Sequence, residues 1–382
     1  MKKIIVALGA TVWFAGFAAT PTITAVTAQQ RYPWNGKVDI SYTVTGDIAA
    51  EAKQRALITS LKVTATDRDA NATYTATKLS GDMLLTAGTH SLVWDMDAEG
   101  LTFKSTNVVF KVSCETTNAL YCVIDLSAGA NATSYPVTYL ASPPSGGFNV
   151  DAYKTTKLVL RRIEPGSFVM GGSYNVTLTR PFFIGIFEVT QKQYTLVAGS
   201  NPSFYNGDKR PVDILSYATW SKETESSIIR KLQAKTGLPF DLPTEAQWEY
   251  ACRSGTTSSY NNGGNTVNDL KKLGRYKDNC SDGKGGYSSQ YPLHTTVGSY
   301  EPNAWGVYDM HGNAWEWCRD AYGNLAGGTD PINLTVTNGR VVRGGCWGSE
   351  AKYCTSSSRG NTPWNGNNGN GAGARLSWTQ SN

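Results

Sequence analysis

The sequence predicts an α+β protein with two domains, a β-sandwich followed by a domain of sparse secondary structure. Three observations indicate this. Residues 32–150 contain short alternating apolar runs separated by Gly and Asn turns, a Pro- and Gly-rich linker occupies 142–147, and the chain beyond it is rich in aromatic residues and glycine. The composition, 40% hydrophobic and 17% charged, is globular and excludes a coiled coil or a wholly disordered chain.

The charge balance does not indicate a polyanionic partner. The formal net charge is +5, and it falls to about +3 if Lys2 and Lys3 are removed with a leader. The basic residues are dispersed, so neither nucleic acid nor an anionic membrane surface is indicated. Only three histidines occur, His90, His294 and His311, which are too few and too scattered to predict a histidine metal centre.

The first residues have the order expected of a secretory signal peptide. Lys2 and Lys3 precede the apolar stretch 4–19, and small residues follow at 25–28, so the leader is predicted as residues 1–28. A retained membrane anchor is the alternative. We therefore expect a protein that is secreted, periplasmic or on the cell surface, without a membrane span after cleavage. Disulfides are permitted there, although seven cysteines leave at least one thiol unpaired.

The first domain is predicted to cover residues 29–150 as an immunoglobulin-like or fibronectin-like sandwich. Its expected strands lie at 38–44, 61–65, 91–94, 108–112 and 122–126. Cys114 and Cys122 are close enough in sequence to link a hairpin. The region contains no cluster of catalytic or metal-binding residue types, so it is expected to act as a spacer or adhesion module.

The second domain is predicted to cover residues 151–382 with few helices. Thr190 with Gln193 and Thr244 with Gln247 match the capping box of a helix start. A longer helix is expected over 216–235, ending at Gly237. With so little regular structure, the domain is expected to depend on aromatic packing, disulfides and ions.

Several collinear motifs in this second domain resemble one known family. They lie at 163–171, 187–190, 193–194, 211–212, 242–251, 297–300, 302–304, 306–317 and 343–345, including LPTEAQWEYA and GVYDMHGNAWEW. Over about residues 157–378 the chain resembles the formylglycine-generating enzymes, also called sulfatase-modifying factors. The resemblance implies a C-type-lectin-like fold, but it leaves the function open because the family contains both oxidases and binding proteins.

The resemblance places a copper site at Ser349 and Cys354. The family's oxidases hold Cu(I) between two cysteines five positions apart, because soft thiolates suit that ion. Here the first position is Ser349, whose hydroxyl is a poor ligand for Cu(I). Cys346 could replace it only with a different loop geometry. The family pattern instead suggests a disulfide between Cys354 and Cys318, with Cys252 and Cys280 as a weaker second pair and Cys346 left over.

Two further kinds of metal site occur in the family, an iron site and calcium sites, and this chain matches only part of them. The histidine triad of its iron enzymes is not matched, because only His294 and His311 lie in this domain, and His311 is expected to be structural. A structural Ca²⁺ site is implied at Asp309, Gly312, Ala314 and Glu316, which offer carboxylates and main-chain carbonyls. The alternative is a solvated acidic turn. A second calcium site within 279–287 matches too loosely to assign ligands.

The C-terminal segment 346–373 is predicted to bind a ligand. Nine of the thirteen residues from 361 to 373 are Asn or Gly, which favours an exposed loop over a core segment. The segment also combines aromatic, hydroxyl and amide side chains, as antibody loops do. The candidate binding residues are Trp347, Ser349, Glu350, Lys352, Tyr353, Thr355, Ser357, Asn361, Trp364, Asn365 and Asn367.

The same segment resembles the variable region of retroelement-diversified binding proteins of this fold. Its frame, 343–345 with Ala351, Cys354, Arg359, Pro363 and 375–376, alternates with positions that are free to vary. Ala374 stands where the family usually has Phe. The sequence therefore predicts an exported protein without catalytic residues that binds a macromolecule or a glycan. The alternative is a formylglycine-generating oxidase with an altered copper site, in which Cys354 and Cys346 serve as ligands.

Overall fold

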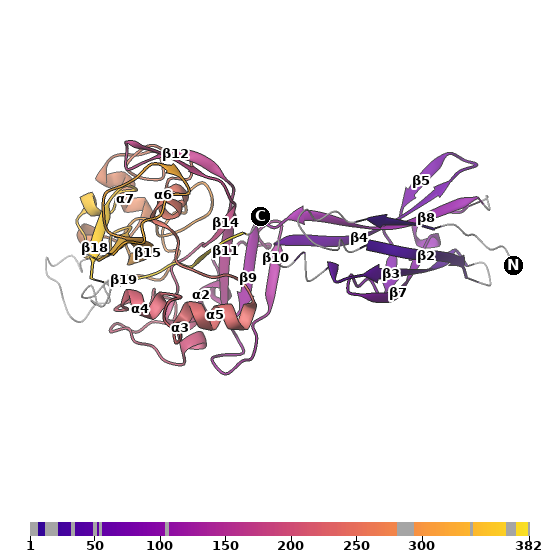
Figure 1. The fold of residues 1–382 in the computed structure, drawn as a ribbon, viewed down its shortest axis with the longest axis horizontal. Helices are drawn as coiled ribbons and strands as arrows, with labels where there is room; N and C mark the ends of the chain where they lie inside the picture. Colours follow the sequence, from indigo (N-terminus) through magenta and orange to yellow (C-terminus); the bar gives the residue numbers. More distant parts are fainter. Residues whose placement is uncertain are drawn as a thin grey trace. The chain divides into compact units, whose positions relative to one another are not determined.

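A computed structural model of the chain is shown in Figure 1. It describes residues 7–11 (backbone only), 22–31, 35–48, 52, 56–103, 107–280, 294–336, 339–363 and 372–380. The chain divides into two compact units, Met1–Asn118 and Ala119–Ser381. The whole is mixed α+β, with many strands and few helices. Among the described residues, no helix combines the length and apolar character that crossing a bilayer requires.

The first unit is built of eight hydrogen-bonded strands in the order β5-β4-β8-β1-β2-β3-β7-β6. All neighbours are antiparallel except β1 and β8. Their inward residues form one core that includes Ile40, Trp94 and Phe110. The strands are β1 (Ala7–Thr11), β2 (Thr22–Gln30), β3 (Lys37–Thr45), β4 (Leu57–Asp67), β5 (Ala72–Thr75), β6 (Leu79–Gly81), β7 (Gly88–Asp95) and β8 (Val108–Asn118). Four of the five predicted strands are confirmed here, whereas the immunoglobulin-like topology stays a prediction.

Strand β2 crosses the predicted leader cleavage position. It pairs with β3, and its side chains at Val26 and Ala28 are buried. Cleavage after Ala28 would remove most of this strand, which pairs with β3 in the first unit; the cleavage position stays a prediction. The small residues that resemble a cleavage site also suit a strand, because Val26 and Ala28 are buried and Thr27 between them is exposed. Export itself stays a prediction.

The second compact unit begins at Ala119, ahead of the predicted domain boundary at residue 150. The predicted strand at 122–126 is β9 (Tyr121–Asp125), which pairs with β10 (Val137–Leu140) and β11 (Lys157–Ile163) of the second unit. The linker-like residues 142–147 instead form a turn, in which Gly146 and Gly147 have positive φ. Cys114 and Cys122 consequently belong to different units.

Three sheets and six short helices make up the described part of the second unit (Figure 1). The sheets have the orders β10-β9-β11-β14-β20, β12-β13-β16 and β18-β17-β15-β19. The remaining strands are β12 (Gly166–Met170), β13 (Tyr174–Leu178), β14 (Phe182–Gly185), β15 (Trp315–Ala321), β16 (Gly328–Thr329), β17 (Arg340–Arg343), β18 (Arg359–Thr362), β19 (Ala372–Gly373) and β20 (Ser377–Thr379). The helices are α2 (Asp151–Thr155), α3 (Gln191–Ala198), α4 (Tyr217–Trp220), α5 (Ile228–Thr236), α6 (Glu245–Arg253) and α7 (Val267–Leu273).

Both predicted capping boxes are confirmed. The hydroxyls of Thr190 and Thr244 accept hydrogen bonds from the third residues of α3 and α6. The single helix expected over 216–235 is wrong: α4 ends at Trp220, and α5 begins after Ser227, whose hydroxyl accepts the Arg230 amide at 3.2 Å. The polar run between them offers its own cap, which competes with helix continuation. Gly237 ends α5 at φ 72°, as predicted.

Candidate functional site

The β18-β17-β15-β19 sheet carries both ends of the C-terminal segment. Residues 344–358 connect β17 to β18, which pair antiparallel, and β19 returns parallel to β15 after the segment. The turn Ala351–Tyr353 (η3) lies between β17 and β18. The predicted binding residues Trp364, Asn365 and Asn367 lie outside the described residues.

The described binding candidates divide by exposure. Glu350, Lys352, Tyr353 and Asn361 are exposed, and Tyr353 retains 46% of its accessible surface. Lys352 lies 2.8 Å from Glu350 and 4.9 Å from the ring centroid of Tyr353, so the three side chains form one continuous patch. Thr355 and Ser357 are half-buried beside this patch in sequence.

Trp347 and Ser349 were predicted to contact ligand, but the structure buries both, at 8% and 9% exposure. Trp347 packs in a cluster with Cys280, Tyr205 and Cys346. The hydroxyl of Ser349 accepts the Cys346 amide at 3.0 Å. Trp347 and Ser349 therefore pack beneath the loop, because the turn that starts at Gly344 directs this part of the chain into the core.

Two glycines make that turn possible. Gly344 and Gly345 have φ of 91° and 78°. A Cβ atom on Gly345 would lie 2.6 Å from Cys354 Sγ and 3.0 Å from the Tyr353 carbonyl oxygen. Because a side chain cannot occupy that space, this glycine lets η3 and Cys354 pack directly on the end of β17.

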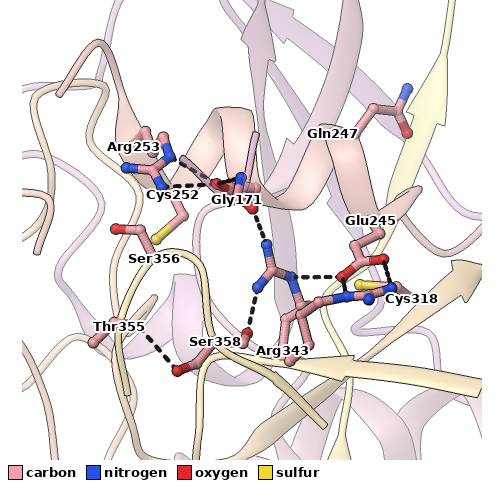
Figure 2. Close-up of polar contacts among 12 residues, drawn as sticks. Gly171, Glu245, Gln247, Cys252, Arg253, Cys318, Arg343, Thr355, Ser356 and Ser358 are labelled. Carbon is pink, nitrogen blue, oxygen red and sulfur yellow. Dashed lines mark hydrogen bonds and ion pairs between the residues drawn. The ribbon is translucent and has the colours of Figure 1, made fainter. Parts of the chain in front are cut away.

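A buried ionic network anchors the segment (Figure 2). The fully buried guanidinium of Arg343 pairs with Glu249, lies 3.3 Å from Glu245 through Nε, and donates to the Ser358 carbonyl. Arg359 donates to Glu245 at 2.5 and 2.7 Å, and Arg253 donates to Glu249 at 2.8 Å. Burial alone would lower the pKa of Arg343, but the Glu249 and Glu245 carboxylates outweigh it and raise that pKa.

This network joins α6 to both strands that flank the segment. Glu245 and Glu249 come from α6, Arg343 ends β17 and Arg359 begins β18. The resemblance had placed Arg343 and Arg359 in a fixed frame, but sequence reasoning missed their carboxylate partners. A spacing of four between two glutamates on one helix face was the available signal.

The two cysteines of the alternative copper site are buried thiols. Cys354 packs against Tyr260, Leu270 and Tyr276. Burial raises the pKa of Cys354, and the nearby Cys346 raises it further. Burial also raises the pKa of Cys346. Thiols held in this way are poorly ionised at neutral pH, and the thiolate is the form that binds metal and reacts.

The predicted disulfides are not formed among the seven cysteines, all of which the structure describes. Cys318 and Cys252 share the core that contains Trp248, whereas Cys354 belongs to a cluster with Tyr260. Cys280 packs with Trp347. Each predicted pair is therefore divided between two clusters, a separation that sequence position does not reveal.

His311 is structural, as predicted. Its Nδ1 donates to the Cys354 carbonyl at 2.7 Å, and its Nε2 accepts the Asn261 amide at 3.1 Å. These two contacts fix the neutral tautomer. Burial lowers the pKa of His311 to about 4.

The residues of the implied calcium site lie beside a further carboxylate and a buried arginine. Glu316 accepts from Arg375 at 2.7 Å on each oxygen and from the Trp248 indole at 2.6 Å. Glu188 accepts from the Ala314 amide at 2.9 Å. Asp309 accepts the Gly298 amide at 2.6 Å through Oδ2, and its buried Oδ1 has no hydrogen-bond partner among the described residues.

These residues fit a cation only in part. Burial raises the pKa of Asp309 to about 6, and burial together with the Asp309 and Glu316 carboxylates raises the pKa of Glu188 well above its ordinary value. The unpartnered Asp309 Oδ1 suits a ligand atom. Glu316 is occupied by Arg375, however, and within the described ranges no three acidic, His or Cys side chains gather as one metal site.

The fold and site define a protein with a formylglycine-generating-enzyme-like scaffold, and family comparison agrees. Residues 150–379 match the model described as the sulfatase-modifying factor enzyme 1-like domain. The chain belongs to this family.

Individual relatives differ in activity and in coverage. The chain is 30% identical over 243 residues to the chaperone protein LppX of Paenibacillus barcinonensis, covering 53% of this chain and 84% of LppX. It is also 30% identical over 159 residues to the formylglycine-generating enzyme of Thermomonospora curvata, covering 37% of this chain and 44% of that enzyme. The match to that enzyme thus spans less than half of its length.

Similar solved structures include Treponema denticola variable protein 1, with a TM-score of 0.48, 25% identity and coverage of 58% of this chain and 95% of that one. PvdO from Pseudomonas aeruginosa has a TM-score of 0.47 and 24% identity, with coverage of 58% and 94%.

Proposed function

We propose that the protein is an exported binding protein that recognises a macromolecule or a glycan through its C-terminal segment and lacks copper-dependent oxidase activity. The observation that carries the proposal is Ser349. It stands at the first copper-ligand position of the resembling oxidases, and its hydroxyl is engaged by the Cys346 amide. A neutral hydroxyl is a hard, weak ligand that cannot replace a thiolate toward Cu(I).

The burial pattern of the segment supports recognition. Frame residues Arg343, Cys354 and Arg375 are fully buried, whereas the variable positions Glu350, Lys352 and Tyr353 are exposed. Side chains in the exposed patch can change without disturbing the buried network beneath it. This separation suits a diversified binding surface, and exposed loops on a rigid scaffold commonly carry binding.

The alternative, an oxidase that uses Cys354 and Cys346, has one observation in its favour. Cys346 contributes to the raised pKa of Cys354, so the two thiols interact electrostatically. Against it, burial raises the pKa of both thiols, which disfavours the paired thiolates that Cu(I) requires.

The double variant Lys352→Ala/Tyr353→Ala is expected to reduce glycan or protein binding at least about tenfold, because it removes the exposed aromatic and its adjacent cation from the patch. Arrays of glycans and of surface proteins, probed with the full chain, would measure this. Lys271→Ala/Lys272→Ala is the matched control, since it removes two exposed lysines from α7. The patch would not be the binding surface if both variants lost the same array signal. It would also not be the binding surface if the Lys352/Tyr353 variant bound as strongly as the wild type.

We further propose a structural Ca²⁺, held by Asp309, Glu316 and the carbonyls of Gly312 and Ala314. The ion would neutralise part of the buried negative charge, and no chemistry is assigned to it. At a hundredfold excess over Kd, Ca²⁺ would add about 2.7 kcal/mol of stability. We expect the melting temperature of the second unit to rise by roughly 5 °C or more over that in a chelator.

Asp309→Asn is the informative comparison for calcium. It removes the charge and keeps the size of the side chain, so the calcium-dependent shift should shrink while the fold persists. A melting midpoint that is the same with calcium and with chelator would argue against the ion.

A further inference from the structure

His90 in the first unit is a buried histidine that the proposed function does not use. It lies on β7, opposite Tyr42 of β3, and only 7% of its side chain is exposed. Its Nδ1 lies 2.9 Å from an Asp82 carboxylate oxygen, and its Nε2 lies 2.8 Å from the Thr86 carbonyl oxygen. Both partners belong to the loop between β6 and β7, residues 82–87. One imidazole ring therefore contacts this loop at two points.

These two contacts require a proton on each ring nitrogen. A main-chain carbonyl and an ionised carboxylate accept hydrogen bonds and cannot donate them, and a neutral imidazole has only one N–H. Hydrogen bonds from His90 and from the Leu84 amide lower the pKa of Asp82, so its carboxylate is ionised at neutral pH. The imidazolium satisfies both oxygens, whereas a neutral ring would set a nitrogen lone pair against one of them.

The surroundings of His90 favour its charged form. Hydrogen bonding to Asp82 and to the Thr86 carbonyl raises the pKa of His90 above the ordinary value of 6.5, although burial opposes this shift. Among the described residues, the Tyr42 phenol also lies against the ring, with centroids 5.4 Å apart. Burial and the Asp82 carboxylate raise the pKa of Tyr42 to about 12, so the phenol stays neutral while His90 titrates.

The loop that His90 contacts presents two apolar side chains to solvent. Met83 is 46% exposed and Leu84 is 56% exposed, whereas Leu85 is buried in the core of the unit. The Tyr42 hydroxyl donates to the Leu84 carbonyl at 2.9 Å, and the Ile48 amide donates to the Leu85 carbonyl at 3.0 Å. These bonds hold the middle of the loop, while the His90 ring joins its first residue to its penultimate one.

We propose that His90 is a pH-dependent clamp on the β6–β7 loop, whose imidazolium orders the loop and whose loss of a proton loosens it. The clamped loop binds the proton more tightly than an opened loop does. The clamp is therefore complete below pH 6.5 and is lost as the pH rises through the folded pKa of His90. It sets how firmly the first unit presents Met83 and Leu84. The inference is independent of the recognition segment, which lies in the other unit.

The test is NMR of the full chain between pH 5.5 and 9, in which the His90 ring is titrated and hydrogen exchange of the loop amides is measured. We expect His90 to titrate above pH 6.5. The protection factors of residues 83–87, which are corrected for intrinsic exchange, should fall several-fold through the same midpoint, because each unit of pKa difference changes the opening equilibrium about tenfold.

Two internal references are available in the same sample. The amides of β3, which pair with β7, should keep their protection, because only the loop loosens. The ring of His311 should remain neutral over this range, because burial lowers the pKa of His311 to about 4.

Two variants separate the clamp from the fold. His90→Gln keeps a polar side chain but no titratable proton, so its loop should have low protection that does not depend on pH. Asp82→Asn removes the carboxylate and should lower the pKa of His90. Asp82 is 43% exposed, so this variant remains informative if His90→Gln fails to fold. Asp39→Asn is the matched control, since it alters an exposed pair with Arg31 and should leave the His90 titration unchanged.

Four results would overturn the proposal. One is a His90 midpoint at or below pH 6.5. Another is loop protection that stays constant through that midpoint. The third is a joint loss of protection in the loop and in β3, which would show that the whole unit opens. The fourth is a His90 midpoint in Asp82→Asn equal to that of the wild type.

Discussion

Replacing Arg343 with methionine is expected to destabilise the second unit by about 3–5 kcal/mol, because removal of one partner leaves buried charges uncompensated. Arg343 has no exposed side-chain surface, and its loss would strand the carboxylates of Glu245 and Glu249 in the core. Arg359 would still pair with Glu245 and Arg253 with Glu249, but Arg343 is the side chain that contacts both carboxylates.

Chemical denaturation followed by tryptophan fluorescence would measure the loss in Arg343→Met. Lys209→Met is the control, since the Lys209–Asp151 pair at 3.0 Å is largely exposed and should contribute less than about 1 kcal/mol. If the two variants lost equal stability, the buried network would not be the anchor of the segment.

Acidification between pH 6.5 and 4 is expected to destabilise the protein through His311, by an amount on the order of 3 kcal/mol. Burial lowers the pKa of His311 to about 4 in the folded state, against 6.5 for the free side chain. The unfolded state therefore binds more protons in this window, so the His311 contribution is complete above pH 6.5 and is lost as the pH falls toward 4. Protonation would also set an Nε2–H against the Asn261 amide.

Buried carboxylates oppose this trend. Burial raises the pKa of Asp309 and of Asp320 to about 6, so their protonation favours the folded state as the pH falls below that value. Comparing the wild type with His311→Gln isolates the histidine, because both proteins retain these aspartates. Unfolding free energies at several pH values should decline more steeply in the wild type; parallel curves would refute the role given to His311.

The sequence predicted those features that local chemistry determines. Capping boxes place α3 and α6 because their contacts lie within four residues, and alternating apolar and polar residues place β3 because one face is buried. The family motifs, over about residues 157–378, located the family domain within a few residues of its matched range, 150–379.

Features that depend on tertiary packing were less predictable. The boundary at Ala119 follows from β9 pairing with β11, which joins segments about 35 residues apart. The burial of Trp347 follows from the turn at Gly344 and Gly345. The polar residues next to Trp347 in the sequence do not predict that its side chain is buried. The link between Arg343 and Glu249 joins residues 94 positions apart.

Copper binding tests the central claim most directly. The purified chain would be titrated with Cu(I) against a chromophoric chelator, and dioxygen consumption would be followed with a cysteine-containing sulfatase peptide. A binding scaffold with Ser349 should load no stoichiometric copper and consume no dioxygen above background. One tightly bound Cu(I) per chain, with peptide oxidation abolished in Cys354→Ala, would contradict it.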